Sequence, residues 1–337
     1  MPDAEQAALV ILNYNGRALL PDCLAAALAQ SVPAAVVVAD NGSSDGSPAW
    51  LRAEYPNVRV LDLGRNWGFA AGYNRALAEV DYPWLALVNN DAELAPDWLE
   101  RLLAFAAARP QAAILGGKLR LAQPGQTRLQ SAGGKFTTAG TAFEMGWGAP
   151  DTGQFDTPGP VGVIPGAAML IRREAWAALG GFDPDYGAYL EDVDLCWRAW
   201  LAGYEVHYRP EAVARHHYGA TAGGRLSPYR VRAMQRNRLA NMVKNLQARS
   251  LPGGLLVSLT YDAYRVLEYG RRGQWANLRA LAGGTAAFGR GLAALLARRG
   301  PVQAGRVLSD ADLRRRGLLA GALEAFWEYR RIGQLSP

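Results

Sequence analysis

Short segments made almost wholly of apolar residues alternate with helical patterns, and this alternation constrains the fold of the chain most strongly. Three such segments are residues 9–12, 36–39 and 84–88. Strands that are apolar on both faces occur in parallel sheets, because helices cover both sides of such a sheet. We therefore expect an α/β fold with a central, mostly parallel sheet.

The same reading predicts further elements along the chain. We expect a strand over residues 58–63 and a helix over residues 69–79. Residues 120–160 are rich in Gly, Thr, Pro and Gln, which predicts loops or a hairpin over the ligand cleft. Beyond Pro228 the pattern is helical to the end. Glycine and proline predict interruptions of these helices at residues 252–254, 283–284 and 300–301.

Charge divides the chain into two parts. Residues 225–337 contain 20 lysines and arginines against 6 acids, whereas residues 1–224 contain 16 against 24. An acidic front and a basic back suggest chemistry in the first part and attachment to an anionic partner by the second. We expect a catalytic domain over residues 1–224 and a basic α-helical region over residues 225–337.

Several classes of protein are excluded by what the sequence lacks. Two cysteines, Cys23 and Cys196, cannot form a disulfide framework or a multi-cysteine zinc site, which indicates a reducing compartment. The amino terminus is acidic and has no secretory signal pattern. Because no unbroken run of about 18 to 20 apolar residues occurs, we expect no membrane-spanning helix and a cytoplasmic setting. Neither a dinucleotide-binding glycine fingerprint nor a P-loop follows the first strand.

Polar clusters follow three of the expected strands, at Asn13-Tyr14-Asn15-Gly16, at residues 40–47 and at Asn89-Asn90-Asp91. Because ligands bind outside the carboxyl ends of parallel strands, these clusters are expected to meet in one cleft. Asp40 is placed to accept hydrogen bonds from a nucleoside base or ribose, or alternatively to form an ordinary turn. Asp91 suits a hard cation on a diphosphate, with Asn89 as a neutral ligand or ribose contact, or alternatively caps a turn.

Later motifs supply candidates for proton transfer, metal binding and phosphate binding. Glu191-Asp192 starts a predicted helix, whose positive end favours the ionised base that accepts a proton from a sugar hydroxyl. His216-His217 ends a predicted strand and suits a metal site with Asp91. Gly68 opens a helix whose free N–H groups suit phosphate. Helix capping, a surface histidine pair and close helix–sheet packing are the respective alternatives.

Taken together, these motifs resemble family 2 glycosyltransferases of the GT-A fold, and in particular their bacterial rhamnosyltransferase-like branch. The resemblance covers about residues 6–224 and follows the family's motif order. The matching segments are residues 11–15, 38–46, 66–74, 88–91, 166–173, 180–183 and 191–198.

The resemblance implies transfer of a sugar from a nucleotide diphosphate donor, with inversion at the anomeric carbon. The donor would be dTDP-rhamnose, a UDP-sugar or a GDP-sugar, and the acceptor a glycan or lipid-linked glycan in cell-surface polysaccharide synthesis. A catalytically silent glycosyltransferase-like binding module and a sugar nucleotidyltransferase are the alternative functions. The nucleotidyltransferase would need a Gly-rich loop with Arg and Lys after the first strand, where this chain has Asn13-Tyr14-Asn15-Gly16.

The resemblance also implies roles for individual residues. Asp192 would be the catalytic base, with Glu191 beside it, and Asp91 would bind Mg²⁺ or Mn²⁺ with His216 or His217. The family's usual Asp-x-Asp is Asn89-Asn90-Asp91 here, which leaves one carboxylate, and we expect a metal still to bind. The nucleotide-sugar site would comprise Asn13, Asn15, Asp40, Asn41, Gly68, Asn74, Asn89 and Asn90.

The basic region predicts the partners of the chain. Helices with arginines on one face and Leu, Trp and Tyr on the other lie in membrane interfaces, so we expect peripheral attachment to the inner face of the cell membrane. A soluble bundle and a homodimer surface are the alternatives. Nucleic acid is not expected as a partner, because the basic region contains no recognisable nucleic-acid motif.

Overall fold

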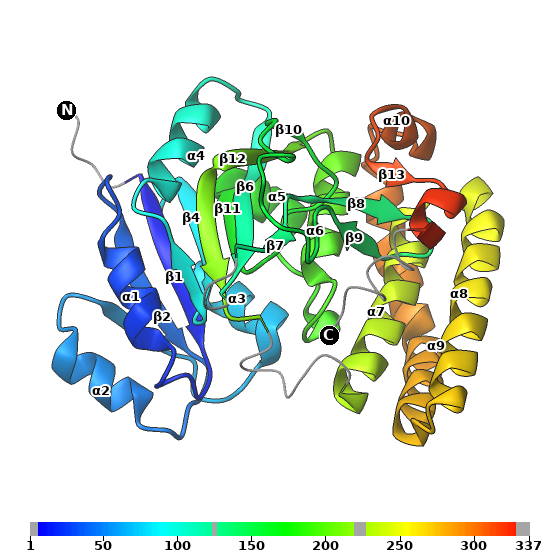
Figure 1. The fold of residues 1–337 in the computed structure, drawn as a ribbon, viewed down its shortest axis with the longest axis horizontal. Helices are drawn as coiled ribbons and strands as arrows, with labels where there is room; N and C mark the ends of the chain where they lie inside the picture. Colours follow the sequence, from blue (N-terminus) through cyan, green and yellow to red (C-terminus); the bar gives the residue numbers. More distant parts are fainter. Residues whose placement is uncertain (1–5, 123–126, 219–226, 328–337) are drawn as a thin grey trace.

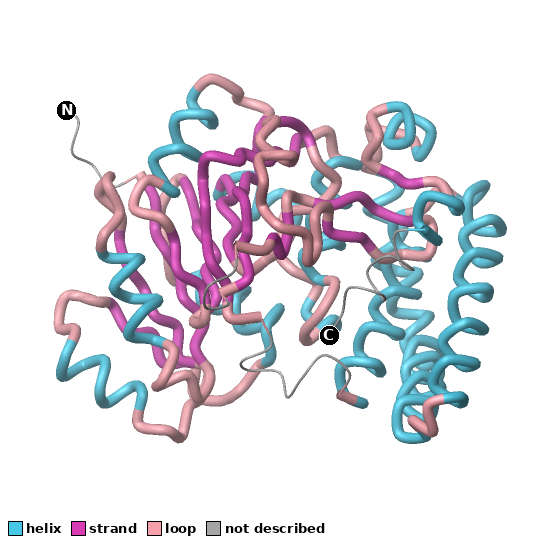
Figure 2. The backbone as a smooth tube through the Cα atoms, in the orientation of Figure 1, coloured by secondary structure: helices cyan, strands magenta, loops and turns pink. Residues whose placement is uncertain are grey.

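The structure, a computed structural model, describes residues 6–122, 127–218 and 227–327 (Figure 1). A large mixed sheet lies at the centre of the α/β part, and long helices form the opposite end of the molecule (Figure 2). The expected α/β architecture with a mostly parallel central sheet is confirmed.

The central path of the sheet runs in the order β10-β12-β6-β11-β4-β1-β2-β3. Its first four strands in the sequence are mutually parallel, and β11 is antiparallel to both of its neighbours. The strands are β1 Ala7–Asn13, β2 Ala35–Asp40, β3 Arg59–Asp62, β4 Trp84–Asn89, β6 Ala112–Leu121, β10 Gly159–Pro160, β11 Ala168–Arg172 and β12 Glu205–His216, and the short β5 Ala92–Leu94 pairs with β12.

Both faces of the sheet are buried, which explains why its strands are apolar throughout. Along β1, Leu9 and Ile11 face one hydrophobic cluster, and Ala8 and Val10 face another. Successive side chains of a strand point to opposite faces, so each face needs its own helical cover. The helices beside the sheet are α1 Leu20–Leu28, α2 Ser47–Glu54, α3 Gly68–Ala78, α4 Trp98–Ala107, α5 Arg173–Leu179 and α6 Glu191–Leu201.

The expected hairpin within residues 120–160 is formed by β8 Gly134–Thr137 and β9 Ala142–Glu144. The preceding strand, β7 Leu129–Ser131, pairs with the central sheet instead. A strand from the far end of the described chain, β13 Leu319–Ala320, pairs in parallel with β8. The helical end of the molecule therefore contributes a strand to the small sheet that stands next to the central one.

The helical end contains α7 Pro228–Asn245, α8 Leu251–Arg271, α9 Trp275–Ala304 and the short α10 Asp310–Arg315. Two of the expected interruptions are wrong, because α9 continues through both the 283–284 and the 300–301 positions. A Cβ atom at Gly284 would lie 2.6 Å from the carbonyl oxygen of Arg232 on α7. Gly284 thus permits close packing of α9 against α7. Pro252 lies in the first turn of α8, where its missing N–H is not needed.

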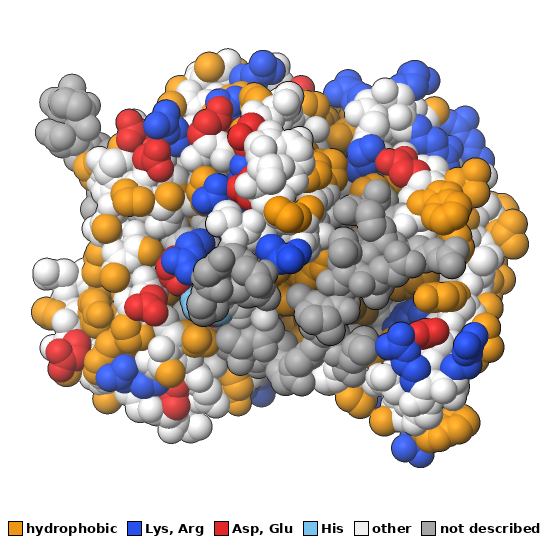
Figure 3. Space-filling model, in the orientation of Figure 1, with side chains coloured by type: hydrophobic (Ala, Val, Ile, Leu, Met, Phe, Trp, Pro, Cys, Tyr) orange, Lys and Arg blue, Asp and Glu red, His pale blue; other side chains and the backbone are white. Residues whose placement is uncertain are grey.

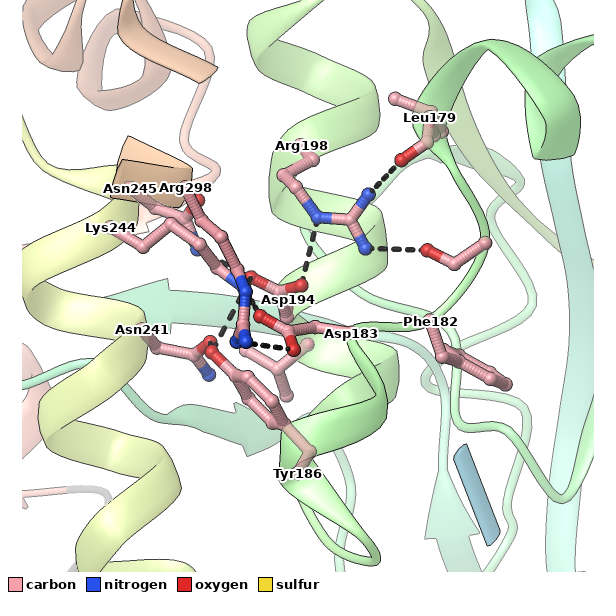
Figure 4. Close-up of polar contacts among 12 residues, drawn as sticks. Leu179, Phe182, Asp183, Tyr186, Asp194, Arg198, Asn241, Lys244, Asn245 and Arg298 are labelled. Carbon is pink, nitrogen blue, oxygen red and sulfur yellow. Dashed lines mark hydrogen bonds and ion pairs between the residues drawn. The ribbon is translucent and has the colours of Figure 1, made fainter. Parts of the chain in front are cut away.

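A buried ionic network joins this helical end to the α/β part (Figure 4). Lys244 of α7 lies 2.7 Å from Asp183 and 2.9 Å from Asp194 of α6, and Asp194 also pairs with Arg198 at 2.8 Å. Arg298 of α9 contacts Asp183 at 2.9 Å. Burial acts to raise the pKa of Asp194, but Arg198 and Lys244 outweigh it and hold that pKa at about 2. The boundary at residue 224 stays a prediction, and the two parts pack as one body across this network.

One helix among the described residues is long and apolar enough to cross a membrane by length and composition. It is α9, with a window of mean hydropathy 1.3 of which 17% is buried inside the protein. The expectation that no helix spans a membrane stays a prediction, because α9 meets the criterion by length and composition only. Isolated arginines such as Arg279 and Arg290 interrupt the helix, so it does not read as an unbroken apolar run.

Candidate functional site

Three polar clusters meet at the carboxyl ends of β1, β2 and β4, as expected. Asn13 is fully buried, and its Nδ2 donates to Asp40 Oδ1 at 3.1 Å and to Ser47 Oγ at 2.9 Å. Its Oδ1 accepts a hydrogen bond from Asn90 Nδ2 at 3.0 Å. Asp40 also accepts the backbone N–H of Ser43 at 2.9 Å, so it does form the turn that was one of its two readings. A base contact by Asp40 stays a prediction.

Other predicted nucleotide-site residues brace loops of the protein. Asn41 accepts the N–H of Trp67 at 2.9 Å and donates to the Gly68 carbonyl at 3.0 Å. Asn74 makes both of its hydrogen bonds with the backbone of Phe182, at 2.7 and 2.9 Å. Asn15 accepts the N–H of Ser44 at 2.8 Å. Ligand contacts by these side chains stay predictions.

The start of α3 does not offer the free N–H groups that the sequence suggested. The N–H groups of Phe69 and Ala70 donate to the Gly187 carbonyl, at 2.8 and 2.9 Å. Gly68 has φ +76°, and a Cβ there would lie 3.2 Å from that same oxygen. The glycine therefore permits close approach of the backbone at Gly187, which lies in a loop and not in the sheet. A ligand contact by Gly68 stays a prediction.

Asp91 and His216 form a pair that fits a divalent cation. Asp91 Oδ1 lies 3.0 Å from His216 Nε2, yet this buried oxygen receives no hydrogen bond from the described residues. His216 Nδ1 lies 2.8 Å from Gln130 Oε1, and because that oxygen can only accept, we assign the ring proton to Nδ1. In that tautomer Nε2 carries the lone pair, and Asn89 Nδ2, 3.3 Å away, can donate to it. A buried Asp91 oxygen without a hydrogen bond from the described residues, 3.0 Å from an imidazole nitrogen, suits a cation that both side chains contact.

The remaining candidates around this pair are arranged as follows. Asn89 Nδ2 lies 3.3 Å from His216 Nε2. His217 turns away to Glu93, with 2.8 Å between His217 Nε2 and Glu93 Oε1. No group of three or more His, Cys, Asp or Glu side chains in the described part of the chain could hold a metal. A cation here would thus take further ligands from a diphosphate and water, as Mg²⁺ commonly does.

Asp192 and Glu191 both lie in the first turn of α6, but their carboxyl groups differ in hydrogen bonding and in the size of the pKa shift. Asp192 Oδ2 accepts the N–H of Gly166 at 3.0 Å, and its Oδ1 accepts its neighbour's N–H. Burial raises the pKa of Asp192, and these hydrogen bonds oppose the rise. Glu191 is buried with one unpartnered oxygen, and burial followed by the charge of Asp192 raises its pKa far more. Of the two carboxyl groups, Glu191 therefore holds a proton more firmly than Asp192.

A buried asparagine of α7 fixes the turn that presents these acids. Tyr189 and Leu190 have positive φ angles, 74° and 66°, which side chains disfavour. Asn237 Nδ2 lies within hydrogen-bonding distance of three carbonyls, those of Tyr186, Ala188 and Tyr189, at 2.7 to 3.0 Å. Sequence reasoning missed both Asn237 and Gln130, because each lies outside the recognised motifs and acts through another group.

Comparisons with known proteins identify the family of the chain. Residues 8–180 match the family model of "Glycosyl transferase family 2". A Mycobacterium tuberculosis protein, "N-acetylglucosaminyl-diphospho-decaprenol L-rhamnosyltransferase", is 32% identical over 236 residues, which cover 64% of this chain and 77% of the relative. The Escherichia coli rhamnosyltransferase WbbL is 44% identical over 52 residues, 15% of this chain and 20% of its own.

Two solved structures are similar in fold. A mannosyltransferase from Pyrobaculum calidifontis in complex with GDP-Man and Mn²⁺ has a TM-score of 0.52 and 18% identity, with 98% of this chain and 89% of that chain covered. The structure of GalNAc-T7 with UDP, GalNAc and Mn²⁺ has a TM-score of 0.55 and 16% identity, with 69% of this chain covered but only 48% of that chain.

Proposed function

Because the chain belongs to glycosyl transferase family 2 and is a nucleotide-sugar glycosyltransferase, we propose that it transfers rhamnose or another hexose to a lipid-linked glycan acceptor. The donor is dTDP-rhamnose, a UDP-sugar or a GDP-sugar, and the anomeric carbon is inverted. The Mycobacterium tuberculosis relative, whose name describes rhamnosyl transfer to N-acetylglucosaminyl-diphospho-decaprenol, supports this donor and acceptor class. The product would belong to cell-surface polysaccharide synthesis.

The Asp91–His216 pair is the observation that carries the proposal. The unpartnered Asp91 oxygen and the assigned lone pair of His216 support these two side chains as ligands of Mg²⁺ or Mn²⁺. When bound, such a cation neutralises the charge that develops on the departing nucleoside diphosphate. Gln130 keeps His216 in the required tautomer, and the pairing of His217 with Glu93 favours His216 as the metal ligand.

Asp192 is the proposed base for the acceptor hydroxyl. Its ionised carboxylate takes the proton of the attacking hydroxyl while the oxygen displaces the nucleotide at the anomeric carbon. The proton retained by Glu191 removes a second negative charge from beside Asp192, which keeps the pKa of Asp192 from rising further. The protein thereby provides one charged carboxylate at the point of attack and holds it through Gly166.

We propose attachment of the helical end to the cytoplasmic face of an anionic membrane. Apolar and basic side chains gather over the helical end of the molecule (right of Figure 3). Leu255, Leu256 and Leu259 of α8 are 48, 68 and 58% exposed. Residues three and four apart share one face of a helix, so these leucines form a single apolar stripe. Such a stripe with arginines nearby suits a membrane interface.

Nucleotide binding with and without metal is the test of the proposed function. Thermal stability is measured with UDP, dTDP, GDP and CDP, each with and without Mn²⁺ or Mg²⁺. A ligand that binds only the folded state stabilises it by about 2.7 kcal/mol at a hundred times its Kd. We expect one nucleotide to raise the Tm, more so with metal, and Asp91→Ala to abolish the metal-dependent part. His217→Ala is the matched control, and no shift with any nucleotide would contradict the proposal.

A further inference from the structure

Glu144, the last residue of β9, is half-buried and has a carboxyl group that the mechanism above does not use. Its Oε2 atom is buried and has no hydrogen-bond partner among the described residues. Buried polar atoms are nearly always hydrogen-bonded, so an unpartnered one beside a reaction site is a candidate contact for a ligand. Glu144 lies on the hairpin that adjoins the catalytic cleft, a segment for which the sequence offered no functional residue.

The groups that face Glu144 come from three elements. They are Asp192 of α6, Arg230 of α7 and the Ser131 side chain of β7. Burial first, and then the charge of Asp192, raise the pKa of Glu144 to about 8, while Arg230 and Ser131 act in the opposite direction. Glu144 is therefore a neutral acid at neutral pH, with one O–H to donate and an unpartnered oxygen.

Aromatic side chains flank the same region. The Arg230 guanidinium lies 5.1 Å from the ring centre of Tyr189 and 5.4 Å from that of Tyr218, and it donates a hydrogen bond to the Tyr218 hydroxyl. Tyr218 in turn lies 6.0 Å from the ring of His216. Glu144, Arg230 and Tyr218 thus form a connected group of side chains. It extends from Asp192, the proposed base, to His216, the proposed metal ligand. Aromatic faces beside a hydrogen-bonding acid match a sugar ring, which has apolar C–H faces and a hydroxyl edge.

We propose that Glu144 binds a hydroxyl group of the acceptor sugar, next to the hydroxyl that Asp192 deprotonates. This inference rests on the proposed function and adds a contact that selects and orients the acceptor. A neutral acid serves here better than a carboxylate, because a second negative charge would raise the pKa of the base and weaken its charged form. Tyr189 and Tyr218 flank the bound sugar, and Arg230 limits the rise in the Glu144 pKa.

Steady-state kinetics with two substrates separate acceptor binding from donor binding. The probe acceptor is an N-acetylglucosaminyl-diphospho-polyprenol. The donor is the nucleotide sugar whose nucleotide part raises the Tm in the stability test. Glu144→Ala is expected to raise the acceptor KM by about tenfold, the value of roughly one hydrogen bond, and to leave the donor KM unchanged. Glu144→Gln keeps a donor and an acceptor in the same place, so its acceptor KM is expected to stay near that of the wild type.

The pH dependence gives a second readout that a structural role would not move. Below about pH 8 Glu144 is protonated, and above it the carboxyl ionises. The acceptor KM of the wild type should therefore rise above pH 8, while that of Glu144→Gln should not rise there. Glu324→Gln is the matched control, because Glu324 is 45% exposed and pairs with Lys135 of the same hairpin.

Each remaining outcome has a stated meaning. An unchanged acceptor KM in Glu144→Ala, an equal rise in both KM values, or a Gln variant as impaired as the Ala variant would overturn the inference. Nucleotide-induced stabilisation of Glu144→Ala checks that the variant is folded, and Glu144→Gln carries the pH test if it is not. Absence of transfer by the wild type would instead overturn the proposed acceptor class, and the inference with it.

Discussion

The polar side chains around the cleft are of two kinds. Some have all their hydrogen bonds made within the protein, and others have a buried polar atom that makes none with the described residues. The side-chain amides of Asn13, Asn41 and Asn74 form hydrogen bonds with other groups of the protein. Asp91 and Glu144 each have a buried oxygen that finds no hydrogen-bond partner in the described part of the chain. The side chains with complete hydrogen bonds form the walls of the site, and we expect a substrate or cation to bind at the side chains with an unpartnered oxygen.

Asp192→Asn provides the sharpest test of a single residue. The amide cannot accept the acceptor proton, so we expect the transfer rate to fall by about a hundredfold to ten-thousandfold. Nucleotide binding should persist, because the Gly166 N–H can still donate to the amide oxygen. Both are measured on one preparation, with Asp81→Asn as the control, since the Asp81 side chain is 93% exposed. Transfer close to the wild-type rate would remove Asp192 from the role of base.

The sequence predicts the places of these residues better than their bonding. Parallel strands end at one edge, so the meeting of Asn13, Asp40 and Asn90 follows from strand order alone. The partner of each amide depends on side-chain torsions and on loops that come from elsewhere in the chain. That is why Gln130 and Asn237, which act on His216 and on the 189–190 turn, have no signal in the sequence.

Among the elements, α9 shows most clearly how packing overrides a local preference. Glycine disfavours a helix interior by about 1 kcal/mol, which is why residues 283–284 predict an interruption. Contact with α7 outweighs that preference, because only a glycine lets the two helices approach so closely. The apolar strands were predictable for the opposite reason, since their burial and their local pattern agree.

Gly284→Ala is predicted to destabilise the protein, although alanine favours helices. The new Cβ would lie 2.6 Å from the Arg232 carbonyl oxygen, so α7 and α9 must separate at a cost of about 1–3 kcal/mol. Gly289→Ala in the same helix meets nothing within 4 Å and should stabilise by about 0.5–1 kcal/mol. Denaturant unfolding measures both, and equal effects of the two variants would contradict the packing argument.

At the scale of the whole molecule, the buried ionic network couples the helical end to α6, the helix that carries the proposed base. Lys244→Met removes the ammonium group that pairs with both Asp183 and Asp194. We expect this change to lower the free energy of unfolding by about 3–5 kcal/mol. Lys135→Met, which removes a partly exposed pair with Glu324, should cost no more than about 1 kcal/mol. Chemical denaturation at neutral pH compares the two, and similar losses would show that the network contributes little.

Acid should weaken the same network. The pKa of Asp194 falls from its ordinary 3.8 to about 2 in the folded protein, so the unfolded chain takes up the proton more readily. The stabilisation is therefore complete above about pH 4 and is lost as the pH falls toward 2. Denaturation midpoints measured between pH 6 and pH 3 should fall less in Asp194→Asn than in the wild type, and a parallel decline would exclude this origin.

The outer face of the helical end carries the last prediction. We expect the protein to float with vesicles that contain phosphatidylglycerol, and the triple change of Leu255, Leu256 and Leu259 to serine to weaken this binding by at least about tenfold. Leu28→Ser is the control, because Leu28 is 50% exposed on α1, away from this face. Failure of the wild type to bind such vesicles would leave the leucine stripe without the proposed role.

The pairing of β13 with β8 has a consequence for how the protein is made. During synthesis, β8 can pair with β13 only after Leu319 has been added to the chain, long after Phe136. A ribosome adds about 5–20 residues per second, so the hairpin that carries Glu144 stays without its third strand for about 10–40 s. Because the central sheet needs no residue beyond 216, the nucleotide side is free to form first. The acceptor side would then mature last, as the newest residues of the chain arrive.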